Sequence, residues 1–179
     1  MLDPEQQRAL FSLAHAAIEA YLDRGDPPPL PHGPGLDEPR GVFVTLRKGS
    51  EHELRGCIGY TVAHLPLAEA VRELAARSAF RDRRFAPVSR AELPELSVEI
   101  SVLTPLERAD PDRIEVGVHG LHVHYGERSG LLLPQVASER RWDAQTFLEA
   151  TCQKAGLPQD AWRRPEAELS WFRCEVYEE

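Results

Sequence analysis

One short segment of the chain combines a thiol, a cation and two glycines: Leu54-Arg55-Gly56-Cys57-Ile58-Gly59. Glycine allows backbone conformations that other residues avoid, and it lets a ligand approach the main chain closely. In an extended chain, a guanidinium two residues before the thiol projects from the same face. Nearby positive charge favours the thiolate, which is the nucleophilic form of cysteine. The segment therefore predicts a nucleophilic site, and the alternative is a tight strand in which Cys57 packs in the core, as free cysteines often do.

The charge distribution bears on the kind of ligand. The net charge is −8, which disfavours broad, non-specific binding of nucleic acid. A local excess of positive charge nevertheless lies between residues 72 and 90, where only Glu73 and Asp82 oppose it. The basic residues are Arg72, Arg77, Arg81, Arg83, Arg84 and Arg90. Such a patch in an acidic protein favours a small anionic ligand over a long polyanion, and the alternative is a solvated helix face and loop.

The histidines and the other two cysteines give weaker signals. His122 and His124 form an H-x-H pair whose side chains leave one face of a strand, but no third and fourth ligand accompanies them. We therefore expect no structural zinc there. Cys152 and Cys174 fall on packed faces and are interpreted as core residues. A Cys-His dyad with Cys57 stays open, and its candidate histidines are His52, His64, His119, His122 and His124.

The chain lacks the sequence motifs of several functional classes. The chain has no G-x-S-x-G elbow of a serine hydrolase, no dinucleotide-binding G-x-G-x-x-G and no P-loop, so no cofactor is expected. Three cysteines without C-x-x-C spacing argue against a disulfide framework. The polar, acidic N-terminus is unlike a signal peptide, and no apolar stretch approaches the ~20 residues that span a bilayer. We expect a cytoplasmic location with no membrane contact.

Length and periodicity predict a single α+β domain over residues 1–179 with a mainly antiparallel sheet flanked by helices. A proline-rich surface linker is expected at about residues 24–40. The clearest strands are predicted at residues 42–46, 97–103 and 170–177, and the clearest helices at 4–23, 144–155 and after Pro66. Gly25 and Gly156 are expected to end the first and last helices.

The middle of the chain predicts short strands at residues 114–118, 121–125 and 131–133. Turns at His119-Gly120 and Ser129-Gly130 would connect them. In the last strand, Phe172, Cys174 and Val176 are expected to share the packed face, opposite Trp171, Arg173, Glu175 and Tyr177.

The chain resembles the AMMECR domain family over nearly its whole length. The hallmark of that family is the six-residue segment around Cys57. Where family members usually have Asp-Pro-Arg-Phe, this chain has Asp82-Arg83-Arg84-Phe85, so the loop that carries Arg84 lacks the restraint of a proline. Further matching segments are Val98–Leu103, Leu132-Leu133-Pro134-Gln135-Val136 and Lys154-Ala155-Gly156-Leu157 with Trp162.

The resemblance implies two lobes within one compact α+β unit, and a protein of unestablished activity. In many prokaryotes such proteins are associated with Memo-like and radical-SAM proteins, the AmmeMemoRadiSam set. These are the partners that the resemblance implies, and the pathway it implies modifies RNA or a small molecule.

Two functional hypotheses follow. The first is an enzyme with a thiol-bearing cleft, in which Cys57 is the nucleophile and Glu99 or a histidine moves protons. Arg55 and Arg84 would bind an anion and lower the pKa of the thiol, and amides around Gly56 would stabilise an oxyanion. Gly59 and Gln135 complete the expected ligand-binding residues. The second is a non-catalytic regulatory or adaptor module that binds a partner protein or RNA.

Overall fold

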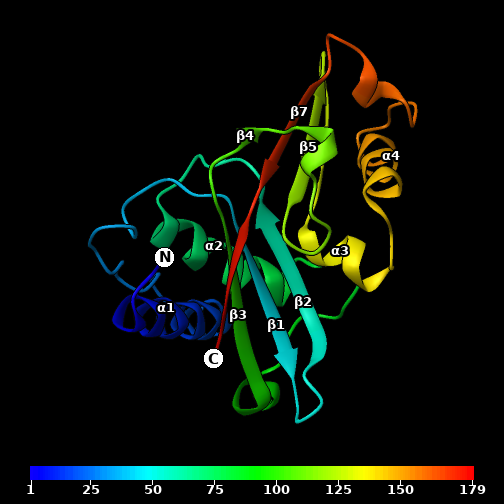
Figure 1. The fold of residues 1–179 in the computed structure, drawn as a ribbon. Coiled ribbons are helices and arrows are strands. Elements are labelled where there is room, and N and C mark those ends of the chain that lie inside the picture. The colour runs from blue at the N-terminus through cyan, green and yellow to red at the C-terminus, as the bar shows by residue number, and fades with distance from the viewer. The chain divides into compact units, whose positions relative to one another are not determined.

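Two four-stranded sheets organise the chain in the computed structural model, which describes residues 1–179 (Figure 1). The first sheet has the order β2-β1-β3-β8 and consists of β1 (Val42–Lys48), β2 (Glu53–Tyr60), β3 (Leu96–Leu103) and β8 (Cys174–Glu178). The second has the order β4-β7-β5-β6 and consists of β4 (Glu107–Arg108), β5 (Gly120–Tyr125), β6 (Arg128–Leu132) and β7 (Glu168–Phe172). The paired strands with a determined register are antiparallel, so the predicted α+β class is confirmed.

Contacts divide the chain into two compact units. The first unit contains residues 1–102 and 175–179, and the second contains residues 103–174. The predicted linker, residues 24–40, lies in the first unit and has no helix or strand apart from an isolated bridge between Pro39 and Pro66. No helix in the molecule combines the length and the apolar character that crossing a membrane requires. The cytoplasmic location stays a prediction.

The core of the first unit lies between one face of its sheet and two helices. Val42, Val44 and Leu46 alternate along β1 and are fully buried. The helix α2 (Leu67–Phe80) packs on β1 and β2, and α1 (Pro4–Asp23) packs on α2 (Figure 1). This arrangement leaves Phe43, Thr45 and Arg47 on the opposite face of β1, next to their partners on β2 and β3.

The first helix has the predicted bounds. Asp3 caps it by accepting hydrogen bonds from the backbone of Glu5 and Gln6, while the Gln6 side chain accepts one from the Asp3 backbone. The residue that ends it in the left-handed conformation is Arg24 (φ 54°), and not Gly25 as predicted. Gly25 instead donates its backbone N–H to the Ala20 carbonyl. The helix therefore ends where predicted, and the left-handed residue that follows it is one position before the glycine.

The second unit packs α4 (Ala144–Lys154) against β5 and β6, around fully buried Phe147, Leu121 and Val123. Cys152 is buried in this core, as predicted. Gly156, with a φ of 70°, follows the last helix and confirms the predicted end. A short helix, α3 (Pro134–Glu139), was not predicted. Three short 3₁₀ helices complete the molecule: η1 (Arg90–Glu95), η2 (Pro111–Arg113) and η3 (Ala161–Arg163).

Two predictions for the middle of the chain are wrong. Residues 114–118 form a loop and turn instead of a strand, because the backbone of Val118 and His119 donates to the Glu115 carbonyl. The turn between β5 and β6 is Gly126-Glu127, where Gly126 has a φ of 60°, so residues 129–130 lie inside β6. The true turn glycine was not distinguished from its neighbours because Gly120, Gly126 and Gly130 lie close together in sequence.

The predicted strand at residues 170–177 is divided at Arg173 between the two sheets. The alternation of faces does not continue through this break. Tyr177 is buried and Val176 is 46% exposed, so the packed face predicted for Val176 is wrong. The Tyr177 hydroxyl accepts a hydrogen bond from the Leu2 backbone and donates one to Glu175, which explains how a phenol is accommodated in this core.

Candidate functional site

Two of the predicted site residues, Cys57 and Glu99, form a row across the first sheet together with Thr45. Thr45 on β1 lies opposite Cys57 on β2 and opposite Glu99 on β3. The Thr45 hydroxyl donates a hydrogen bond to the Cys57 sulfur at 3.2 Å. Thr45 and Glu99 are buried, and Cys57 is half-buried. The register therefore brings Cys57 and Glu99 to the same face, separated by one strand, and adds Thr45, which the sequence did not single out.

The Glu99 carboxylate is already engaged in this row. Arg47 contacts one of its oxygens with both Nε, at 2.9 Å, and Nη2, at 2.8 Å. Both contacts are charge-assisted, and they occupy one of the two carboxylate oxygens. The role of Glu99 as a proton carrier stays a prediction. That role would require the ion pair with Arg47 to open.

Burial raises the pKa of the Cys57 thiol, which is the opposite of the predicted direction. The hydrogen bond from Thr45 and the charge of Arg84 act to lower that pKa, while the charges of Glu99 and Asp82 raise it. Arg55 is not among the groups that shift it. Arg84 thus acts in the predicted direction and burial outweighs it, while the predicted effect of Arg55 is not among the causes; sequence spacing shows the cations but neither the burial of the sulfur nor the two nearby carboxylates.

Arg55 is committed to a partner on another element. The β1–β2 register shifts after Leu46, which pairs with Gly56, while Arg47 pairs with Leu54, so Arg55 is the extra residue of a bulge. Its Nε and Nη2 contact the two oxygens of Glu92 at 2.8 and 3.3 Å. Its guanidinium also lies over the Phe85 ring, 5.9 Å from the centroid. The arginine side chain is 13% exposed and its Nη1 has no hydrogen-bond partner.

Glu92 responds strongly to this ion pair. The hydrogen bond from Arg55, followed by bonds from Ser89, lowers the pKa of Glu92 well below its ordinary range. Glu92 closes the capping box of η1 by accepting from the backbone and the hydroxyl of Ser89. The predicted anion-binding arginine thus joins the bulge of β2 to η1.

Both glycines of the segment make room for the protein itself. A Cβ at Gly56 would overlap the carbonyl oxygen of Ser78 at the end of α2, and a Cβ at Gly59 would overlap the Phe43 ring. The Ser78 hydroxyl lies between β1 and β2, where it accepts from the Ile58 backbone at 2.9 Å and donates to the Val44 carbonyl at 2.7 Å. The close approach that the glycines allow is therefore the approach of α2 and of Phe43.

The outer edge of β2 is capped at Cys57 by one ion pair. Asp82 accepts a hydrogen bond from the Cys57 backbone N–H at 2.9 Å, and Arg84 donates to the Cys57 carbonyl at 3.3 Å. The two side chains also bond to each other at 2.7 Å, which lowers the pKa of Asp82 well below its usual range. Such a pair replaces a neighbouring strand and blocks pairing at a sheet edge. Arg84 keeps this position although Arg83 replaces the proline of the family pattern.

Half of the arginines of the basic patch are ion-paired with carboxylates of the same unit. Of its six arginines, only Arg83 has no ion pair or hydrogen bond from its side chain. Each of the other five has a partner: Arg72 donates to the Pro28 carbonyl, Arg77 contacts Tyr60 and Glu73, Arg81 donates to the Tyr21 hydroxyl, Arg84 pairs with Asp82, and Arg90 pairs with Asp23. The patch therefore offers a free anion less positive charge than the sequence indicates.

The remaining predicted residues lie in the second unit. Gln135 is on α3, and its side chain forms no hydrogen bond. His122 contacts the Ser129 hydroxyl at 3.0 Å, and His124 lies 3.5 Å from Glu168. Burial, followed by the charge of His124, lowers the pKa of His122. The molecule has no group of three or more histidine, cysteine or acidic side chains arranged to hold a metal ion, and the absence of zinc stays a prediction.

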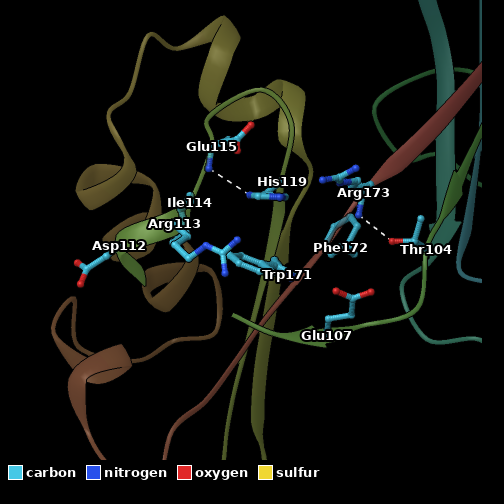
Figure 2. A pocket seen from close by; sticks show the side chains of 10 residues that line it. All are labelled: Thr104, Glu107, Asp112, Arg113, Ile114, Glu115, His119, Trp171, Phe172 and Arg173. Atoms are coloured by element: carbon cyan, nitrogen blue, oxygen red, sulfur yellow. Dashed lines mark hydrogen bonds between the residues drawn. The ribbon is translucent and has the colours of Figure 1, made fainter. Parts of the chain in front are cut away.

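A pocket of about 830 Å³ in the second unit was missed by the sequence analysis (Figure 2). The buried His119 ring stacks on Trp171, with 4.5 Å between the ring centroids and 21° between their planes. Arg113 and Arg173 line the same pocket. Arg113 and Arg173 are far apart in sequence, so no local pattern indicates this site. The one local signal is the tight turn that ends at His119, and the strand predicted at residues 114–118 is incompatible with that turn.

Comparison with known proteins places the chain among relatives of similar length. The family model described as AMMECR1 matches residues 11–177. Protein MK0488 of Methanopyrus kandleri is 44% identical, with 98% of this chain and 89% of the relative aligned. A protein of Thermococcus gammatolerans is 46% identical, with 95% and 88% aligned. The crystal structure of the uncharacterised protein PH0010 from Pyrococcus horikoshii matches with a TM-score of 0.86 and 43% identity, covering 99% of this chain and 93% of that one. The chain therefore belongs to the AMMECR1 family.

Proposed function

We propose that this protein is a non-catalytic regulatory or adaptor module, in which the Cys57 segment organises the first unit instead of attacking a substrate. The state of the thiol carries the proposal. Burial raises its pKa above the ordinary value of a cysteine, which disfavours the nucleophilic thiolate. A catalytic cysteine requires the opposite, a lowered pKa or an adjacent general base.

The surroundings of the thiol support the same conclusion. Each histidine considered for a dyad lacks a hydrogen bond or ion pair to Cys57, and the sulfur instead accepts from Thr45. The backbone N–H of Cys57, which a nucleophilic site would direct at an oxyanion, is occupied by Asp82. Arg55 and Arg84 are each held by a carboxylate. These internal contacts explain the composition of the segment without a substrate.

The enzyme hypothesis retains two supporting observations. Cys57 is half-buried and not sealed in the core, and Nη1 of Arg55 is buried without a partner. A ligand that supplied an acceptor to that nitrogen would remove a cost of desolvation. The charge of Arg84 already acts to lower the pKa of the thiol, and the charge of its partner Asp82 opposes that effect.

The partners to test are the Memo-like and radical-SAM proteins that the family resemblance implies. We expect each purified partner, taken from the same genome, to bind the intact chain in a pull-down and by calorimetry. The Cys57→Ser variant removes the thiol with little change in volume, so its affinity should stay within about twofold of wild type. A turnover assay of the reconstituted mixture completes the test. Failure of both partners to bind, or an activity that disappears in Cys57→Ser while binding remains, would overturn the proposal.

A further inference from the structure

The pocket of the second unit differs from the Cys57 segment because its charged side chains have no internal partners. Its five charged lining residues are exposed, and none of them forms an ion pair: two are the arginines Arg113 and Arg173, and three are the acidic residues Glu107, Asp112 and Glu115. Cations and carboxylates thus line one cavity of about 830 Å³ without neutralising one another. This volume is within the range of small-molecule sites. Unpaired groups of both signs in a pocket are suited to a ligand that offers complementary groups of both kinds.

His119 supplies a fixed hydrogen-bond donor in this pocket. The backbone N–H of Glu115 donates to its Nδ1 at 3.1 Å, so the proton of the neutral ring resides on Nε2. The ring is held further by stacking on Trp171 and by a turn in which the His119 backbone donates to the Glu115 carbonyl. His119 is only 6% exposed, and its Nε2 has no partner in the protein. The protein does not seal this nitrogen from solvent, so it can donate to an acceptor that enters the pocket.

The backbone also fixes the position of Arg173. The N–H of Arg173 donates to the Thr104 hydroxyl at 2.8 Å, and the N–H of Thr104 donates to the Arg173 carbonyl at 2.9 Å. In Figure 2 the guanidinium of Arg173 points toward His119, and that of Arg113 extends toward Trp171. Arginine binds carboxylate and phosphate groups through two parallel hydrogen bonds. The pocket therefore combines a flat aromatic surface with two cations available for an anion.

From these contacts we infer that the pocket binds a small molecule that joins a flat ring to an anionic group and N–H donors. The ring would stack on the Trp171–His119 pair, the anionic group would contact Arg113 or Arg173, and the N–H groups would donate to Glu107 or Glu115. Nucleotides and aromatic amino acids share this chemistry. The inference goes beyond the proposed function, because it holds whether or not Cys57 acts as a nucleophile.

The test is calorimetric titration of the full chain with guanosine monophosphate and, separately, with L-tryptophan. We expect saturable binding of at least one probe, and the probe that binds more tightly identifies the source of the ligand. Arg173→Gln should weaken that binding at least about tenfold, as one charge-assisted contact is lost. Trp171→Leu should do the same through loss of stacking. Arg108→Gln changes an exposed arginine of β4 that does not line the pocket, and it should leave the affinity unchanged.

Thermal unfolding of every variant accompanies the titrations. If Trp171→Leu does not fold, Trp171→Phe keeps a ring in place and Arg173→Gln, at an exposed position, still tests the site. His119→Asn preserves an acceptor for the Glu115 backbone while removing Nε2, so it should weaken binding in a folded protein. The inference is overturned if neither probe shows saturable binding up to about 5 mM. It is also overturned if wild-type affinity persists in both Arg173→Gln and Trp171→Leu, or, where Trp171→Leu does not fold, in both Arg173→Gln and His119→Asn.

Discussion

The two compact units use their charged side chains in opposite ways. Around Cys57, each arginine is paired with a carboxylate of the same unit: Arg47 with Glu99, Arg55 with Glu92, and Arg84 with Asp82. In the second unit, Arg113 and Arg173 line a pocket beside carboxylates with which they form no ion pair. Paired charges stabilise a fold, whereas charges left without partners in a cavity remain available to a ligand. This difference is the basis for our proposal that the family's signature segment and a ligand-binding pocket reside in different units.

Because the glycines of the Cys57 segment make room for the protein itself, we expect the largest loss of stability when this close packing is disturbed. In Gly56→Ala the new Cβ meets the Ser78 carbonyl, so either α2 or β2 must move. We expect a loss of about 3 kcal/mol in the free energy of unfolding, measured by urea titration. Gly25→Ala is the matched control, since its Cβ has only ordinary contact with the Ala20 carbonyl oxygen at 3.9 Å. Equal stability of the two variants would show that Gly56 does not serve packing.

The ion pair between Arg55 and Glu92 should have the next largest effect. Arg55→Leu leaves the Glu92 carboxylate, which is 17% exposed, without its main partner. We expect a loss of about 2 kcal/mol, less than for a fully buried pair because water reaches both side chains. Chemical denaturation at pH 7 measures it. A change below a few tenths of a kcal/mol would mean that the pair does not stabilise the fold.

The same pair gives a pH dependence with a definite sign. The pKa of Glu92 is lowered in the folded protein, so its contribution to stability is complete above its unfolded pKa of about 4.5. That contribution is lost as the pH falls from this value toward the folded pKa. Glu92→Gln should therefore flatten the fall in stability between about pH 5 and pH 2. Glu95→Gln, at a 59% exposed carboxylate, is the control and should keep the wild-type profile.

Removal of the edge cap should have a smaller and more local effect. In Asp82→Ala the Cys57 N–H and the Arg84 guanidinium both lose their acceptor. We expect about 1 kcal/mol of destabilisation and faster amide hydrogen exchange at Cys57. Exchange that stays slow at Cys57 while the protein is folded would show that another group protects this edge.

The smallest expected effect concerns His122 and His124 in the second unit. Their nearest polar partners are Ser129 and Glu168, so replacing either histidine by alanine should leave the metal content unchanged. Elemental analysis of protein prepared without added metal checks this expectation. One equivalent of zinc that disappears in either variant would contradict it.

The sequence predicts those parts of the fold whose signals are local. The helix at residues 4–23 has its cap and its apolar periodicity within one segment, and β1 and β3 have continuous apolar runs. The division of the last strand at Arg173 depends on pairing with Thr104, about seventy residues earlier. No window of neighbouring residues contains that information.

The candidate site shows the same limit. Residue types indicated that Arg55, Cys57 and Arg84 matter, and the structure brings Cys57 and Arg84 into contact. Their chemistry depends on Asp82, Glu92 and Thr45, whose positions follow from register and loop geometry. Spacing can place a cation near a thiol, but it cannot show that a carboxylate has already neutralised the cation or that burial has raised the pKa of the thiol.

The ionisation of Cys57 tests the central claim most directly. The rate of its alkylation by iodoacetamide can be followed from about pH 6 to pH 10 in the wild type and in Arg55→Leu, with peptide mapping to separate Cys57 from Cys152 and Cys174. We predict a midpoint above that of a free cysteine, and the same midpoint in folded Arg55→Leu, because Arg55 does not shift this pKa. A midpoint near or below pH 7 in the wild type that rises in Arg55→Leu would contradict the account and establish Cys57 as an arginine-activated nucleophile.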